Sequence, residues 1–89
     1  MDLQGKVALV TGGAVRVGRA ISLALAERGA IVAVNYHASA DAAHELVAQI
    51  ERRGGSAAAF QADVSDVDAV RRMVADVAAR FGGLDVLVN

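Results

Sequence analysis

The 89-residue sequence contains no cysteine and no proline, and only 3% of its residues are aromatic. Without cysteine, the chain can build neither a disulfide framework nor a thiolate metal site. The formal net charge is −1, which argues against a nucleic-acid or anionic-membrane partner, because both require a clustered basic surface. The apolar runs are too short to span a bilayer, and the N-terminus lacks a basic segment followed by an apolar stretch. We therefore expect a soluble, cytoplasmic protein.

Apolar residues make up 55% of the sequence, and they fall into short runs separated by amphipathic segments. The runs predict strands at 6–11, 30–36, 56–63 and 84–89, each bounded by glycine or polar residues. The segments between them predict three helices. This regular alternation indicates an α/β fold with a parallel sheet, right-handed crossovers and helices on the sheet faces.

The helices carry their own start and stop signals. Gly29 is the predicted stop of the first helix, and Ser39 is the predicted N-cap of the second. Ser65 is the predicted N-cap of the third, because "SDVD" (65–68) fits the Ser-x-x-Asp variant of a capping box. The apolar faces predicted to be buried are Ala20, Ile21, Ala24 and Leu25 in the first helix, and Val67, Val70, Val74, Val77 with Ala78, and Phe81 in the third.

The first strand leads into the first helix through a glycine-bearing loop. Such a turn places backbone N–H groups and the positive end of a helix dipole where a phosphate can bind. Gly12 ends the strand and Gly18 opens the helix, positions at which a Cβ would block the turn or the close packing of the helix. Two glycines six residues apart also fit an ordinary strand-to-helix turn, so the loop alone does not decide between the two interpretations.

Three segments in register resemble the short-chain dehydrogenase/reductase family. "TGGAVRVGRA" resembles its T-G-x-x-x-G-x-G loop, with Thr11, Gly12 and Gly18 matching and Arg16 in place of the middle glycine. "ADVSD" (62–66) resembles the segment after its third strand, and "LDVLVN" resembles its fourth strand running into Asn89, the first residue of an Asn-Asn-Ala-Gly motif. The resemblance implies a Rossmann-type, doubly wound parallel sheet, here with four strands and three helices, that binds a nicotinamide dinucleotide.

Arg16 is the departure from the family loop. Some members, notably the pteridine reductases, carry arginine there, and the resemblance implies a side chain that lies along the cofactor phosphates. A guanidinium can form bidentate, charge-assisted hydrogen bonds with a pyrophosphate. The alternative is a side chain that simply points into solvent.

The end of the second strand predicts which nicotinamide cofactor binds. Sites that prefer NAD place a carboxylate there to bind the ribose hydroxyls. Here Asn35, Tyr36 and His37 occupy that region, and no acidic residue lies between them and Asp41. We therefore predict NADP(H), with its extra phosphate near His37 and Ser39, although His37 also fits an ordinary solvated loop residue.

The resemblance also implies a role for the ends of the third and fourth strands. Asp63 would accept a hydrogen bond from the adenine amino group, and Val64 would make backbone contact; the alternative for Asp63 is a turn residue. No cluster of His, Asp or Glu has metal-ligand spacing, so we predict no metal. The complete set of predicted cofactor-binding residues is Gly12, Ala14, Arg16, Val17, Gly18, Tyr36, His37, Ser39, Asp63, Val64 and Asn89.

The catalytic residues of the family are missing from this sequence. Its members use a Ser and a Tyr-x-x-x-Lys pair, whereas the only tyrosine here, Tyr36, is followed by Ala40 at the lysine position. We therefore predict that residues 1–89 are the N-terminal part of a single NAD(P)-binding domain, truncated after the fourth strand, with catalytic residues beyond Asn89. The full protein would be an oligomeric, NADPH-dependent reductase of a 3-oxoacyl or similar ketone, or of a pterin. The alternative is a non-catalytic nucleotide-binding fragment or interaction module.

Overall fold

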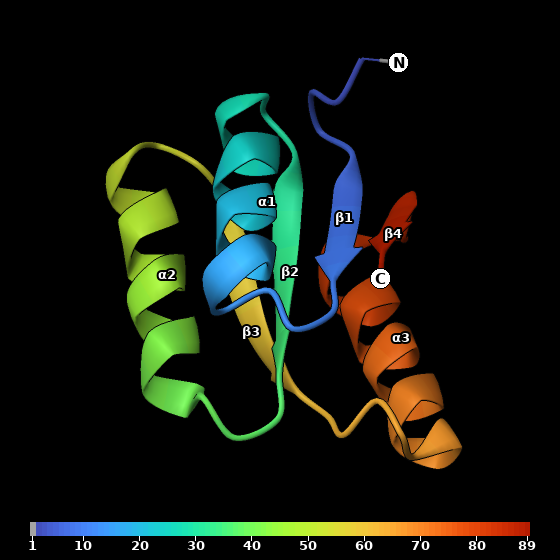
Figure 1. The fold of residues 1–89 in the computed structure, drawn as a ribbon. Helices are drawn as coiled ribbons and strands as arrows, with labels where there is room; N and C mark the ends of the chain where they lie inside the picture. Colours follow the sequence, from blue (N-terminus) through green and yellow to red (C-terminus); the bar gives the residue numbers. More distant parts are fainter. Residues whose placement is uncertain (1) are drawn as a thin grey trace.

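A computed structural model describes residues 2–89. Its sheet has four parallel strands in the order β3-β2-β1-β4 (Figure 1). The strands are β1 (Val7–Val10), β2 (Ile31–Tyr36), β3 (Ala57–Gln61) and β4 (Val86–Val88), and the helices are α1 (Arg16–Glu27), α2 (Ala40–Arg52) and α3 (Val67–Phe81). The predicted α/β, Rossmann-type fold is confirmed, with each predicted strand present and somewhat shorter than expected.

The helices cover both faces of the sheet, α1 and α2 on one and α3 on the other (Figure 1). Consecutive residues of β1 therefore enter different clusters: Leu9 packs with Met73 and Val77 of α3, whereas Val10 packs with Leu46 of α2. This double coverage explains why β1 and the middle of β2 read as continuous apolar runs.

The buried face of α1 differs from the prediction. Ala20 and Ala24 are exposed, whereas Ile21 and Leu25 are half-buried as expected. Ser22 is fully buried, and its hydroxyl donates a hydrogen bond to the carbonyl oxygen of Gly13 at 3.1 Å. This local hydrogen bond lets a polar side chain occupy the inner face of the helix.

The predicted N-cap of α3 is wrong by one residue. The cap is Asp66, whose carboxylate accepts hydrogen bonds from the N–H groups of Asp68 and Ala69. On the same helix, Val67 is 63% exposed, and Met73 joins Val77 as the buried anchor. Ser39 does precede α2 as expected, but its side chain makes no capping hydrogen bond.

The parallel register gathers all four carboxyl-terminal strand ends at one edge of the sheet. The chain order reverses between β1 and β4, and ligands of open α/β sheets bind at such a switch point. None of the three helices in residues 2–89 has the length and apolar character needed to cross a membrane.

Candidate functional site

The predicted cofactor-binding residues all lie at the carboxyl-terminal edge of the sheet or directly after it. Gly12, Ala14, Arg16, Val17 and Gly18 follow β1. Tyr36 is the last residue of β2, and His37 and Ser39 follow it in the chain. Asp63 and Val64 follow β3, and Asn89 follows β4. The fold therefore brings together, at the edge where a ligand would bind, segments that are far apart in the sequence.

The glycine loop is tightly packed against itself. Gly12 has a φ of +61°, which favours glycine. A Cβ on Gly18 would overlap the carbonyl oxygen of Gly12, and a Cβ on Gly13 would come within 2.9 Å of the Ser22 hydroxyl. The sequence predicts glycine at 12 for a sharp turn and at 18 for close helix packing. The positive φ of Gly12 and the lack of room for a Cβ at Gly18 agree with these reasons.

Arg16 occupies the first residue of α1 with a φ of +52°. This left-handed conformation costs a non-glycine residue about 1 kcal/mol or more. Glycine suits this loop position because it adopts a positive φ without strain, and here arginine adopts a positive φ instead. The side chain is exposed, so its guanidinium is free to reach a ligand at this edge.

The start of α1 has the electrostatics of an anion site. Within the described chain, its N-cap residue, Val15, makes no side-chain capping bond, and its first turn contains no acidic residue. Arg19 donates to the carbonyl of Val15, so the N–H groups of Arg16, Val17 and Gly18 precede the first helical hydrogen bond. The uncompensated N–H groups and the positive end of the helix dipole favour a phosphate here.

Asp63 is held by the loop that follows β3. One carboxylate oxygen accepts the Ser65 hydroxyl at 2.7 Å and the Ser65 N–H at 2.9 Å, and the other lies 3.9 Å from Nε2 of His37. These contacts, the Ser65 hydroxyl foremost, lower the pKa of Asp63 below its ordinary value. The carboxylate is therefore ionised near neutral pH, beside the His37 that follows β2.

The remaining predicted cofactor-binding residues differ in their burial and contacts at the carboxyl-terminal edge. Ala14 is 2% exposed and packs in the core cluster, so only its backbone can face a ligand. Tyr36 is half-buried, and its ring meets that of His44 edge-on, with 6.0 Å between the centroids. Val17 and Val64 are exposed. Asn89 accepts a hydrogen bond from the Thr11 hydroxyl at 3.2 Å, which links the ends of β4 and β1.

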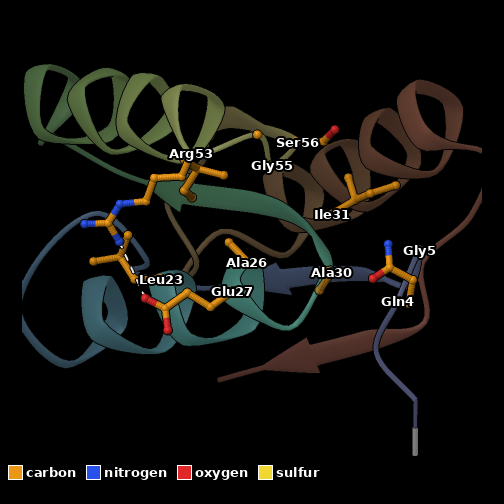
Figure 2. A pocket seen from close by; sticks show the side chains of 13 residues that line it. Gln4, Gly5, Leu23, Ala26, Glu27, Ala30, Ile31, Arg53, Gly55 and Ser56 are labelled. Atoms are coloured by element: carbon orange, nitrogen blue, oxygen red, sulfur yellow. Dashed lines mark hydrogen bonds and ion pairs between the residues drawn. The ribbon is translucent and has the colours of Figure 1, made fainter.

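A large groove lies at the opposite edge of the sheet (Figure 2). It has a volume of about 630 Å³ and lies beside the amino-terminal ends of the strands and the C-terminal ends of α1 and α2. Arg53 and Glu27 form an exposed ion pair across it at 3.5 Å. None of the predicted cofactor-binding residues lines this groove. Elsewhere in residues 2–89, no group of three His, Asp or Glu side chains is arranged to hold a metal.

Comparison with known proteins decides the family. The family model described as short chain dehydrogenase matches residues 6–89. The chain belongs to this family. A short-chain dehydrogenase/reductase homolog, YusS, of Bacillus subtilis (strain 168) is 48% identical over 89 residues, which cover all of this chain and 82% of that protein.

Other members of the short chain dehydrogenase family are longer. The 3-oxoacyl-(acyl-carrier-protein) reductase FabG of Staphylococcus aureus (strain Mu50 / ATCC 700699) is 49% identical over 84 residues, or 94% of this chain and 34% of FabG. A short chain dehydrogenase from Burkholderia cenocepacia J2315, solved in complex with NADP, matches with a TM-score of 0.94 and 54% identity. That match covers 100% of this chain and 36% of the solved one. The chain thus spans most of YusS but about a third of these two relatives.

The sequence pattern did not predict the burial or the contacts of two polar residues. Asn35 and Ser22, which are 2% and 0% exposed, both hydrogen-bond to the glycine loop. A polar residue inside an otherwise apolar run, as in "IVAVNY" (31–36), was the available signal. Its partners could not be read from the pattern, because they lie on other elements.

Proposed function

We propose that residues 1–89 are the N-terminal, NADP(H)-binding part of a reductase domain of the short chain dehydrogenase family. The observation that carries the proposal is the start of α1, which begins with Arg16 and has neither a side-chain cap nor an acidic residue in its first turn. This donor set fits the pyrophosphate of a dinucleotide, since backbone N–H groups, a helix dipole and a guanidinium all favour phosphate oxygens. The NADP complex of the Burkholderia relative supports the same assignment.

The choice of NADPH over NADH rests on the end of β2. Residues 35–39 contain no carboxylate that would bind ribose hydroxyls and repel a 2′-phosphate. His37 and Ser39 are exposed there, and the Ser39 side chain is not occupied by capping α2. We assign the 2′-phosphate to these two side chains, and the adenine to the Asp63 and Val64 segment.

When bound, NADPH supplies the hydride for reduction, and the residues described here bind and orient it. The substrate we propose is a carbonyl compound, a 3-oxoacyl group or similar ketone, or a pterin; FabG is a 3-oxoacyl reductase, and Arg16 favours a pterin. A reductase of this type also needs a proton donor near the developing alkoxide. The proposal therefore places the Ser and Tyr-x-x-x-Lys set beyond Asn89, in a protein that acts as a dimer or tetramer.

Titration of the full-length protein with NADPH and NADH tests the cofactor assignment. We expect NADPH to bind at least about tenfold more tightly, because a charge-assisted hydrogen bond contributes roughly 1.5 to 3 kcal/mol. His37→Ala combined with Ser39→Ala should remove most of this preference. The matched control is Arg53→Ala with Ser56→Ala, which removes a basic side chain and a hydroxyl at the opposite edge. Equal affinities for the two cofactors in the wild-type protein would refute the assignment.

The second candidate function is a nucleotide-binding protein without catalysis. It is favoured by YusS, 82% of which is covered by these 89 residues. The two candidates differ in turnover. A reductase consumes NADPH with at least one substrate of a panel of 3-oxoacyl thioesters, ketones and pterins, whereas the second candidate binds NADPH and consumes none.

A further inference from the structure

Asn35 is a buried polar residue near the carboxyl-terminal end of β2, an inner strand of the sheet. It occupies the fifth position of β2, next to the fully buried Val34, and is itself 2% exposed. A buried carboxamide without hydrogen-bond partners would strongly destabilise the fold, so the partners of Asn35 explain how it can be buried.

The Asn35 side chain joins the glycine loop to the end of β3. Its Oδ1 accepts the N–H of Gly12 at 3.1 Å, and its Nδ2 donates to the carbonyl oxygens of Phe60 at 3.3 Å and Ala62 at 3.2 Å. Nδ2 also lies 3.3 Å from the sulfur of Met73. Only an amide has the acceptor and the two donors that these partners need, so the orientation of the carboxamide is fixed.

The backbone of Asn35 adds a further link to the loop, because its carbonyl accepts the N–H of Gly13 at 3.0 Å. Both glycine N–H groups are therefore turned toward β2 and away from a ligand. The donors of the first turn of α1 remain for a phosphate, and their distance from β2 depends on where Gly12 and Gly13 are held. On the other side, Ala62 directly precedes Asp63.

We propose that Asn35 is a positioning residue that holds the glycine loop and the Asp63 segment at the separation required by one dinucleotide. This proposal rests on the proposed function, because the two segments are assigned to the pyrophosphate and the adenine. Asn35 itself does not touch the cofactor. It acts through Gly12 and Ala62, which an apolar residue of similar size in β2 would leave unpaired.

The test compares Asn35→Leu and Asn35→Ala with the wild-type, full-length protein. Leucine keeps the branched shape and the number of side-chain heavy atoms but loses the hydrogen bonds, and alanine removes the carboxamide without adding bulk. We expect each variant to bind NADPH about tenfold more weakly, the effect of losing roughly one net hydrogen bond. We expect the hydrogen-bonded Gly12 amide to exchange slowly in the wild-type protein and about tenfold faster in both variants.

The matched control is Ile50→Ala, which opens the core at a 1% exposed residue of α2. All affinities are measured at a temperature where circular dichroism shows every variant folded. A purely structural role for Asn35 predicts that Ile50→Ala weakens NADPH binding as much as Asn35→Ala does, and this result would overturn the proposal. Unchanged NADPH affinity with a still-protected Gly12 amide in either Asn35 variant would overturn it as well.

The two proposals fail in different ways. If the wild-type protein binds neither NADPH nor NADH, the proposed function is refuted, and with it the role of Asn35 toward a dinucleotide. Gly12 exchange then still decides whether Asn35 holds the loop. If the wild-type protein prefers NADPH and the Asn35 variants share its affinity, only the positioning role is refuted.

Discussion

At the scale of single residues, Arg16 combines a backbone cost with an exposed positive charge. Its φ of +52° would suit glycine better. A non-glycine residue in this conformation loses about 1 to 2 kcal/mol. The fold therefore gives no reason for an arginine here, and the proposed contact of its guanidinium with the cofactor phosphates does.

Arg16→Gly should change stability and binding in opposite directions. We expect the free energy of unfolding to rise by about 0.5 kcal/mol, because relief of the left-handed conformation outweighs the extra chain entropy of glycine. NADPH should bind about tenfold more weakly, since a charge-assisted contact is lost. Urea denaturation and NADPH titration measure the two effects.

Arg16→Ala is the matched control for this prediction. It removes the guanidinium but retains a Cβ at a positive φ, so we expect the loss of NADPH affinity without the gain in stability. An Arg16→Gly protein that binds NADPH as tightly as the wild type would show that the side chain points into solvent.

Residue patterns predicted the tight turn of the glycine loop but not the hydrogen bonds of Asn35, for a physical reason. Gly12 and Gly18 are constrained by the turn that contains them, so a local motif records that constraint. The role of Asn35 depends on Gly12, 23 residues before it, and Ala62, 27 residues after it. Such a role follows only from how the strands pair.

At the scale of elements, the start of α3 shows two local interactions competing for the same residues. The Asp63 carboxylate binds both the hydroxyl and the N–H of Ser65. Because the Ser65 side chain is bonded to Asp63 in the turn after β3, Asp66 and not Ser65 caps α3. The sequence "SDVD" contained the capping signal, but it could not show that Asp63 engages the serine.

Substitutions at 65 and 66 should therefore have different effects. Asp66→Ala should lower the free energy of unfolding by about 1 kcal/mol through loss of the α3 cap. Ser65→Ala should cost less and should raise the pKa of Asp63 toward its ordinary value, because the leading cause of its lowered pKa is the Ser65 hydroxyl. Urea denaturation measures the first effect, and an NMR titration of the Asp63 carboxyl carbon measures the second.

The pH dependence of stability has a definite sign here. Because folding lowers the pKa of Asp63, this group stabilises the folded state above its ordinary pKa, and the contribution is lost as the pH falls through the lower, folded value. Ser65→Ala should reduce that loss on acidification. An unchanged Asp63 pKa in Ser65→Ala, with Ser56→Ala as the exposed-serine control, would contradict this account.

At the scale of the whole molecule, the alternation of apolar runs predicted a parallel α/β sheet, and the glycine loop with its family resemblance predicted that the sheet is doubly wound. Strands covered on both faces are largely apolar; β1 is apolar throughout, and β2 is apolar except for the buried Asn35 and the half-buried Tyr36 at its end. The helix faces were predicted less well, because Ala20 and Ala24 are apolar residues that α1 leaves exposed. Likewise, Leu87 of β4 is 58% exposed, although it lies in an apolar run.

The groove of about 630 Å³ and the predicted cofactor-binding residues lie at opposite edges of the sheet. The groove beside Gly29 and Gly54 adjoins the C-terminal ends of α1 and α2, which repel phosphate. The carboxyl-terminal edge contains the N-terminus of α1 and the polar side chains to which we assign the dinucleotide. The proposed site therefore rests on charge and hydrogen-bond donors rather than on cavity volume.

The most direct test of the central claim is to locate NADPH by amide chemical-shift changes in the isotopically labelled, full-length protein. We predict that the largest changes fall on the 12–18 loop, His37 and Asp63, with the amides of Gly29 and Gly54 little affected. Changes that cluster at the groove, or none at the carboxyl-terminal edge at saturating NADPH, would contradict the assignment.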